Sequence, residues 1–201
     1  MASMTTRGRP KSFCPDRALE NAMQLFWQRG YEAASLQDLQ AATGLSKSSL
    51  YQTYPSKQAW FVAAFSRYVA QRRALLLEQL DVSASPLAFI RERLLSVLED
   101  DGPGGVPRGC MLVNVANEFS LSEPALVPVL QQATAGVCQV FEEALARAVA
   151  CGELRNGQDL AARAGYLQCV MSGLRTQVKS AVPADSIRAT VAVVMASLDC
   201  Q

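Results

Sequence analysis

Apolar residues recur at helical spacing along most of this chain. Leu19, Ala22 and Met23 stand three and four positions apart, which places them on one face of a helix that ends at Gly30. Residues 57–80 carry the same spacing without a helix breaker, which predicts one helix of ~40 Å at ~1.5 Å per residue. The remaining helices are expected at about 36–42, 47–54, 86–98, 110–119, 124–152, 158–180 and 184–199. The pattern therefore predicts an all-α protein of about nine helices.

The stretch from Ser35 to Lys57 predicts two short helices joined by a tight turn, with a third helix starting just after them. The Ser35 hydroxyl can cap the first helix, and Asp38 lies where an acidic side chain favours the positive end of the helix dipole. Gly44 can adopt the positive φ that follows a helix end, and Ser46 can cap the second helix. These local signals predict a pair of short helices at a tight turn.

The second of these helices exposes side chains that suit contact with DNA. Pro55 ends it, because the residue before a proline is pushed out of helical geometry. Small hydroxyls, an amide, cations and phenols can approach a phosphate backbone and the base edges of a major groove. The candidate DNA-binding residues are Ser35, Ser46, Lys47, Ser48, Ser49, Tyr51, Gln52, Tyr54 and Lys57. Spacing alone also allows a helical hairpin with a polar surface.

Five residues match the end of a recognition helix and the start of the helix after it. Leu50, Tyr51 and Tyr54 stand at the end of the first, and Ser56 and Lys57 open the second. This order resembles the helix-turn-helix of the TetR/AcrR family of transcriptional repressors. The resemblance implies a homodimer that binds a palindromic double-stranded DNA operator and is released by a small-molecule effector. It also implies that the last two helices of each subunit form a four-helix bundle in the dimer.

The resemblance divides the chain into an N-terminal three-helix DNA-binding domain and a C-terminal helical domain for effector binding and dimerisation. One departure is Gln40, which stands where the family usually has a small alanine. The expected parts are a flexible basic arm at 1–13 with Arg7, Arg9 and Lys11, the helix-turn-helix domain at 14–57, and the effector and dimerisation domain at 58–201.

Charge and composition agree with this division. Residues 1–80 carry ten Lys and Arg against five Asp and Glu, and residues 81–201 carry nine against thirteen, so the basic half contains the predicted helix-turn-helix. The six cysteines include no CxxC pair and the chain has no His, so no metal site and no cofactor are expected. With no apolar run of the ~20 residues that a membrane helix needs, we expect no membrane partner and a cytoplasmic protein with reduced thiols.

The segment Arg108-Gly-Cys-Met-Leu-Val-Asn114 resembles a Gly-Cys-x-Leu-x-Asn signature of one branch of these regulators. Cys110 follows a glycine-rich loop and stands beside Arg108, and a helix N-terminus with a nearby cation lowers a thiol's pKa. Cys110 is therefore either a sensor of electrophiles or oxidants, or a small buried hydrophobe. A reversible ligand is the other possible effector, and the candidate lining residues are Phe89, Cys110, Met111, Asn114, Glu118, Tyr166, Gln168, Met171 and Arg175.

Two other classes of protein compete with a regulator. An enzyme would have to use a Cys or Lys nucleophile, because the sequence has no His for general base catalysis and no phosphate-cradling glycine loop. A purely structural helical dimer or adaptor is the third possibility. Arg72 and Arg73, near the middle of the long helix, are expected on a solvated face.

Overall fold

The computed structural model describes residues 14–99, 109–119, 124–157 and 159–199, and within them every regular element is helical. The expected basic arm at 1–13 and Arg108 lie outside the described residues. The elements are α1 (Pro15–Arg29), α2 (Leu36–Thr43), α3 (Lys47–Thr53), α4 (Lys57–Val82), α5 (Pro86–Leu95), the 3-10 helix η1 (Ser96–Glu99), α6 (Met111–Phe119), α7 (Val127–Ala150), α8 (Leu160–Lys179) and α9 (Ala184–Asp199). The all-α fold class is confirmed, with nine α-helices in the described part of the chain.

The predicted caps fix the α2–α3 turn. Ser35 and Asp38 form a capping box, in which the Ser35 side chain accepts from the Asp38 backbone N–H and the Asp38 carboxylate accepts from the Ser35 backbone N–H. Gly44 ends α2 with φ 72°, and the Ser46 hydroxyl caps α3 by accepting from the backbone N–H of Ser49. The helix-turn-helix expected from the sequence is therefore present.

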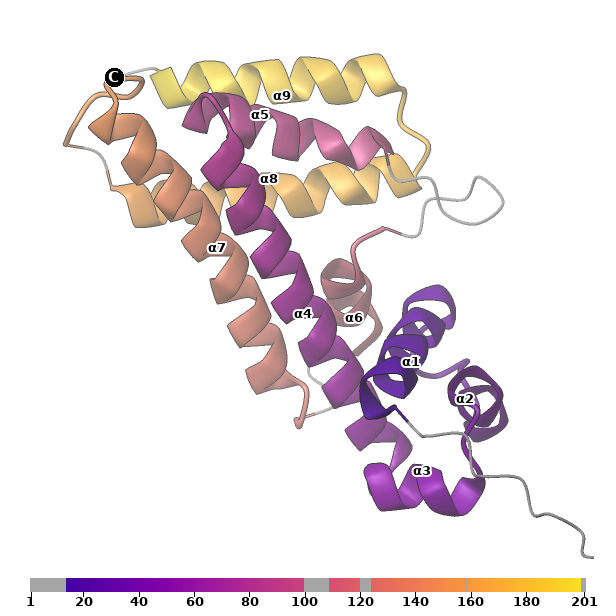
Figure 1. The fold of residues 1–201 in the computed structure, drawn as a ribbon. Helices are drawn as coiled ribbons and strands as arrows, with labels where there is room; N and C mark the ends of the chain where they lie inside the picture. The colour runs from indigo at the N-terminus through magenta and orange to yellow at the C-terminus, as the bar shows by residue number, and fades with distance from the viewer. Residues whose placement is uncertain (1–13, 100–108, 120–123, 158, 200–201) are drawn as a thin grey trace, which may run out of the picture.

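Helix α4 connects two hydrophobic cores. It has 26 residues and runs from the α2–α3 end of the molecule to the bundle of α5, α8 and α9 (Figure 1). Its N-terminal half buries Trp60 and Phe61 in the core around α1 to α3, and its C-terminal half buries Leu76 and Leu80 in the core of the bundle. Helix α4 therefore belongs to both hydrophobic cores.

Helix α6 packs with the N-terminal core rather than with the bundle. Met111, Val115 and Phe119 repeat every four residues and are all buried in the cluster that also contains Phe26 and Phe61. The Phe119 ring lies 5.3 Å from the Phe61 ring, centroid to centroid. The segment that begins just after Cys110 is therefore attached to the helix-turn-helix.

Two helix boundaries differ from the sequence expectation. Helix α7 begins at Val127 rather than Pro124, with Pro128 in its first turn, where a proline needs no hydrogen-bond partner. The expected helix at 86–98 ends at Leu95 and continues as η1.

Among the described residues, no helix is long and apolar enough to cross a membrane, and no group of three acidic or cysteine side chains could hold a metal ion.

Candidate DNA-binding surface and effector cavity

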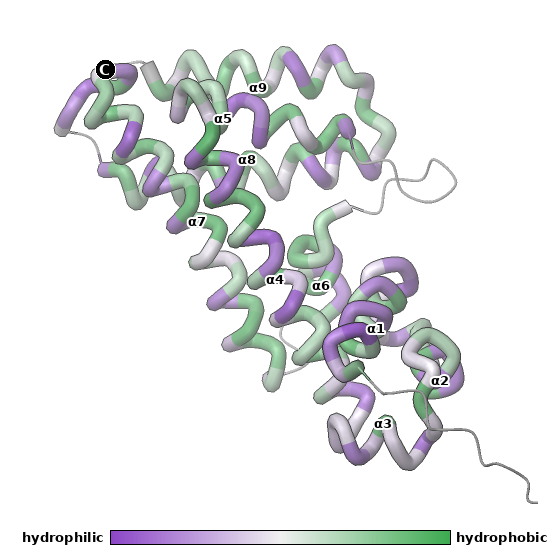
Figure 2. Tube along the Cα trace, in the orientation of Figure 1, coloured by the Kyte–Doolittle hydropathy of each residue, from purple (hydrophilic) through white to green (hydrophobic). Residues whose placement is uncertain are grey.

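The outer face of α3 is polar and exposed, and α3 is mostly white and purple in Figure 2. Lys47, Ser48, Tyr51 and Gln52 are all exposed, with Tyr51 at 42%. Ser49 is half-buried, and its hydroxyl lies 3.0 Å from the Ser46 hydroxyl. The short α3 therefore presents one cation, one phenol, one amide and small hydroxyls, while Leu50 anchors it in the core.

Three other predicted DNA-binding residues have structural contacts of their own. The Tyr54 ring packs edge-on against Trp60, with 4.7 Å between the centroids. The Lys57 ammonium lies 4.3 Å from the centroid of the Tyr31 ring and donates to the Glu32 carbonyl at 3.4 Å. Ser35 belongs to the capping box described above. Lys57 thus joins the start of α4 to the turn between α1 and α2.

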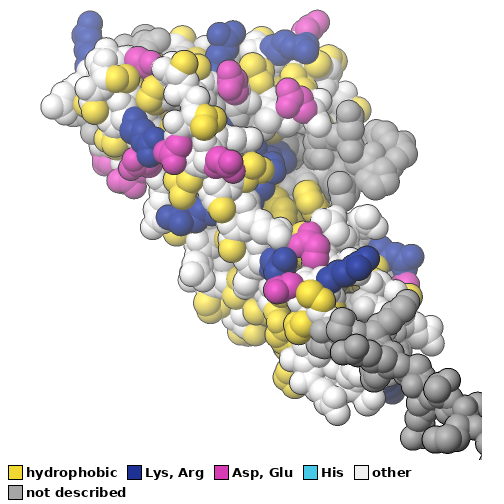
Figure 3. Space-filling view, viewed as in Figure 1, with side chains coloured by type: hydrophobic (Ala, Val, Ile, Leu, Met, Phe, Trp, Pro, Cys, Tyr) yellow, Lys and Arg dark blue, Asp and Glu magenta, His cyan; other side chains and the backbone are white. Residues whose placement is uncertain are grey.

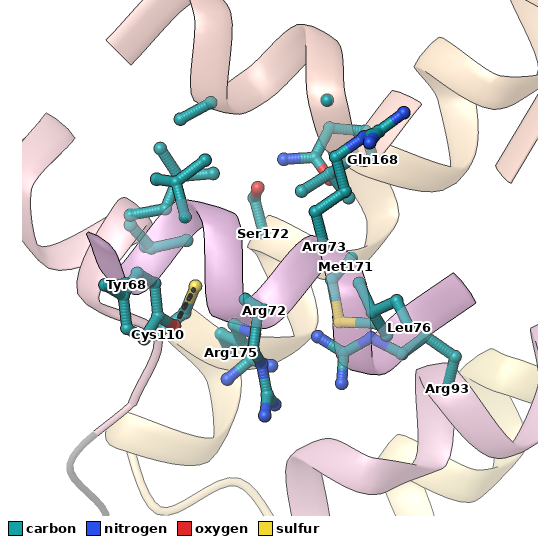
Figure 4. Close-up of a pocket in the computed structure, with 16 residues that line it drawn as sticks. Tyr68, Arg72, Arg73, Leu76, Arg93, Cys110, Gln168, Met171, Ser172 and Arg175 are labelled. Carbon is teal, nitrogen blue, oxygen red and sulfur yellow. Dashed lines mark hydrogen bonds between the residues drawn. The ribbon is translucent and has the colours of Figure 1, made fainter. Parts of the chain in front are cut away.

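A cavity lies between α4, α7 and α8, beside the start of α6 (Figure 4). Its empty volume is about 560 Å³, part of which is open to solvent. Of the residues predicted to line an effector site, it brings together Cys110, Gln168, Met171 and Arg175. The last three follow one face of α8, at i, i+3 and i+7.

Five predicted lining residues lie outside this cavity. Met111 is buried in the N-terminal core, and Phe89 is buried in the bundle core and lines a neighbouring cleft instead. Asn114 accepts a hydrogen bond from the Lys179 ammonium, and Glu118 is turned toward the α1–α2 turn. Tyr166 is 42% exposed, because it lies on the opposite face of α8 from Arg175. The helix faces set by tertiary packing explain where these five side chains lie.

The expectation of a solvated face at Arg72 and Arg73 is wrong for Arg72. Both arginines line the cavity, and the Arg72 Nε is buried. Sequence reasoning also missed Tyr68 and Arg93, which contribute to the same cavity. The sequence did contain a signal for Tyr68 and for Arg72. These two residues precede the buried Leu76 at four-residue intervals and so share its helix face.

Cys110 has a thiol that lies beside groups able to stabilise its thiolate form. It is partly exposed, and its Sγ lies 3.4 Å from the Tyr68 hydroxyl. Burial by itself raises the thiol's pKa, but the charge of Arg175, the Tyr68 hydroxyl and the N–H groups of Val113 and Leu112 outweigh it, so the Cys110 pKa lies below its ordinary value. Burial, followed by the nearby Cys110, raises the Tyr68 pKa, so the phenol stays protonated and can donate to a thiolate.

Helix α6 is tied to the DNA-binding helices at both ends. At its far end, the Glu118 carboxylate accepts from the backbone N–H groups of Tyr31 at 3.2 Å and Glu32 at 2.9 Å. At its start, the Trp27 indole donates to the carbonyl of Gly109 at 3.0 Å. Helix α6 therefore connects the segment at Cys110 with the turn that also contacts Lys57. We call these contacts of Glu118 and Trp27 the α6 clamp.

An all-helical fold with an N-terminal helix-turn-helix, a connecting helix and a cavity in the second core defines a one-component regulator architecture. Residues 18–64 match the family described as bacterial regulatory proteins, tetR family, and residues 87–193 match the tetracyclin repressor-like C-terminal domain. The chain belongs to the tetR family of bacterial regulatory proteins.

Two similar proteins support this assignment, and a third shares the fold. The HTH-type transcriptional repressor ComR of Escherichia coli K12 is 31% identical over 174 residues, which cover 84% of this chain and 81% of ComR. A cysteine mutant of the TetR family regulator CifR, solved in complex with 26bp operator DNA, is 31% identical with a TM-score of 0.79, covering 95% of this chain and all of that chain. The reduced form of E. coli NemR, 23% identical with a TM-score of 0.81 over 90% of this chain and 94% of its own, shares the fold.

Proposed function

We propose that this chain is a homodimeric transcriptional repressor that binds a palindromic operator and releases it when an effector acts at the Cys110 cavity. In this proposal residues 14–57 bind DNA, and residues 58–201 bind the effector and form the dimer. The observation that carries it is the α6 clamp, which links the segment after Cys110 to the backbone at Tyr31 and Glu32. ComR is named a repressor, and CifR was solved with operator DNA, which supports the same role here.

The DNA contacts follow from the exposed face of α3. With α3 in a major groove, Lys47, Tyr51, Tyr54 and Lys57 hold phosphates, and Ser46, Ser48, Ser49 and Gln52 are placed for base or near-base contacts. The two half-sites of the operator should then lie at least about one helical turn, ~34 to 36 Å, apart.

The dimer surface is formed by the outer faces of α8 and α9. Val193 on α9 is 69% exposed. On α8, a side chain added at Gly165 or Gly173 would meet no other atom of the chain within 4 Å, so these glycines leave room for a partner helix to approach closely. Hydrophobic side chains are also visible on the face shown in Figure 3, scattered among polar and charged ones. The α8 and α9 surfaces are apolar or small, which favours association through these two helices.

Release of DNA begins at the Cys110 thiolate. The thiolate adds to the electrophilic carbon of an α,β-unsaturated carbonyl compound, a new S–C bond forms, and the displaced π-electron pair takes a proton from water at the adjacent carbon. The added group occupies the cavity against Tyr68 and Arg175, so Gly109 and the start of α6 must shift. The α6 clamp then passes this shift to the α1–α2 turn and to Lys57.

Operator binding is tested with fluorescence anisotropy on the DNA that flanks the coding region. The full-length protein should bind it saturably in the presence of nonspecific competitor, with an affinity that falls as salt rises. Lys47→Ala removes one phosphate contact from each subunit of the dimer and should lower the salt slope by about 1.8, whereas Arg91→Ala, the same charge change at an exposed position of α5, should leave it unchanged. Equal slopes for the two variants would refute the docking of α3.

A further inference from the structure

We propose that the cavity beside Cys110 binds a small organic anion, with a carboxylate held by Arg72, Arg93 and Arg175 and an apolar body packed against α4, α7 and α8. This inference rests on the proposed function, because it takes the cavity to be the effector site. It names the chemical class of effector that the site accepts.

The first observation is the convergence of three guanidinium groups from three helices. Arg72 comes from α4, Arg93 from α5 and Arg175 from α8, and Figure 4 shows their side chains turned toward the same space. Arg175 is only 7% exposed. The Nε of each of the three is buried and has no hydrogen-bond partner. Buried donors normally have partners, so three orphaned donors in one place indicate a missing acceptor.

No carboxylate of the described residues supplies that acceptor. The ion pairs among the described residues involve other arginines, namely Arg29, Arg67, Arg147 and Arg188. Glu92 and Glu99 line the adjoining cleft, but neither forms an ion pair with the three arginines. Among the described residues, the cluster makes one hydrogen bond, from the Arg93 Nη1 to the Ser96 hydroxyl, at 3.0 Å. No ion pair with a described carboxylate offsets the charge of the cluster, and a Cys110 thiolate beside Arg175 would offset only part of it.

Electrostatics agree with this geometry. Burial, followed by the charges of Arg175 and Arg72, lowers the Arg93 pKa to about 10. Holding three like charges together in a partly dry site is unfavourable, and a bound carboxylate would remove that penalty while accepting charge-assisted hydrogen bonds. A neutral ligand of the same shape would leave the penalty in place, so the site discriminates by charge.

The rest of the cavity is apolar. Leu76, Val137 and Met171 contribute to its wall, together with Leu112 and Ala133. Arg72, Arg93 and Arg175 also line the larger adjoining cleft, so there is room for a small molecule beside the three guanidinium groups. The ligand that complements both parts is an amphiphilic monoanion with a short hydrocarbon body. Because the same Arg175 stabilises the Cys110 thiolate, such an anion should also slow alkylation of Cys110.

The test measures binding of hexanoate and of hexanamide to the dimer by isothermal titration calorimetry. The two compounds share a hydrocarbon chain and differ in charge. Hexanoate should bind saturably and at least about tenfold more tightly than hexanamide, since a hydrogen bond to a charged group contributes enough to account for such a factor. Arg93→Gln and Arg175→Gln should each weaken hexanoate binding about tenfold. Arg91→Gln, an exposed arginine of the same helix as Arg93, should leave it unchanged.

Thermal melting checks that each variant is folded, and Arg175→Lys, which keeps the charge but not the fork of donors, provides a second variant with an intermediate loss. Hexanoate should also slow the alkylation of Cys110 in the wild type and not in Arg175→Gln. Equal affinities for hexanoate and hexanamide, no saturable binding of hexanoate, or full affinity in folded Arg93→Gln and Arg175→Gln would each overturn the inference.

The proposed function fails separately, because it is measured on DNA. If the protein binds its operator and releases it on alkylation while hexanoate does not bind, the anion site is refuted and the repressor is not. If hexanoate binds with the expected charge preference while no operator binding occurs, the anion site stands and the repressor is refuted.

Discussion

Replacing Glu118 with alanine should uncouple the Cys110 cavity from the operator. The carboxylate accepts two backbone hydrogen bonds, from Tyr31 at 3.2 Å and from Glu32 at 2.9 Å. Each hydrogen bond to a charged group contributes about 1.5 to 3 kcal/mol when it is well formed. Glu118 is exposed, so competition with water reduces the pair to about 1 to 2 kcal/mol in total. If this contact carries the coupling, its loss should reduce the response about 5- to 30-fold.

The response is the ratio of two operator dissociation constants, one for protein alkylated at Cys110 and one for unmodified protein. Fluorescence anisotropy measures both constants for the wild type, Glu118→Ala and Glu118→Gln. Glu118→Gln keeps a carbonyl acceptor but loses the charge, so its ratio should fall between the other two. Glu78→Ala, which removes an exposed carboxylate from α4, should keep the wild-type ratio. A wild-type ratio in folded Glu118→Ala would refute the α6 clamp as the route of coupling.

Three further predictions follow from the geometry. Gly30→Ala should destabilise the fold by about 1 to 3 kcal/mol and reduce the alkylation response, because Gly30 has φ 78° and an added Cβ would lie 3.1 Å from the Glu118 carboxylate. The control Gly44→Ala, at φ 72° with open space around the added Cβ, should cost only about 1 kcal/mol. Denaturant unfolding compares the free energies of unfolding of the two variants. Val193→Glu should place a charge in the dimer surface and convert the dimer to monomer in sedimentation, and an unchanged mass would argue against α9 as an interface. The rate of Cys110 alkylation should rise with pH around a midpoint below ~8.5, the pKa of a free thiol, because only the thiolate reacts. Arg175→Gln should move that midpoint upward. A midpoint at or above the free-thiol pKa would contradict the lowered Cys110 pKa.

Local signals predicted the elements of this chain well. The caps at Ser35 and Ser46 and the positive φ at Gly44 depend on residues within three or four positions of each helix end, so the sequence contains them directly. The length of α4 followed from an apolar pattern without a breaker. The start of α7 was misplaced because Pro124 and Pro128 both suit a first helical turn, and the pattern does not distinguish between them.

The composition of the cavity was harder to predict, because it depends on contacts between distant segments. Glu118 meets Tyr31 across 87 positions, and no periodicity in either segment indicates that pairing. Arg72 is charged and would be expected to face solvent, yet its side chain is turned inward because α4 packs between α7 and α6. Cys110 and Arg175 were both candidates from the sequence, but only the tertiary structure brings them to one site.

The most direct test of the switch is operator affinity before and after alkylation of Cys110 alone. Cys14, Cys151 and Cys169 are exposed and would react as well, so the measurement uses a variant in which the other five cysteines are serine. The matched control also carries Cys110→Ser.

Treatment with N-ethylmaleimide should weaken operator binding by the Cys110 protein at least about tenfold, corresponding to a coupling free energy of about 1.4 kcal/mol, and should leave the control unchanged. Mass spectrometry confirms that one maleimide is attached. Unchanged operator affinity in the fully alkylated Cys110 protein would contradict the central claim that this cavity controls DNA binding.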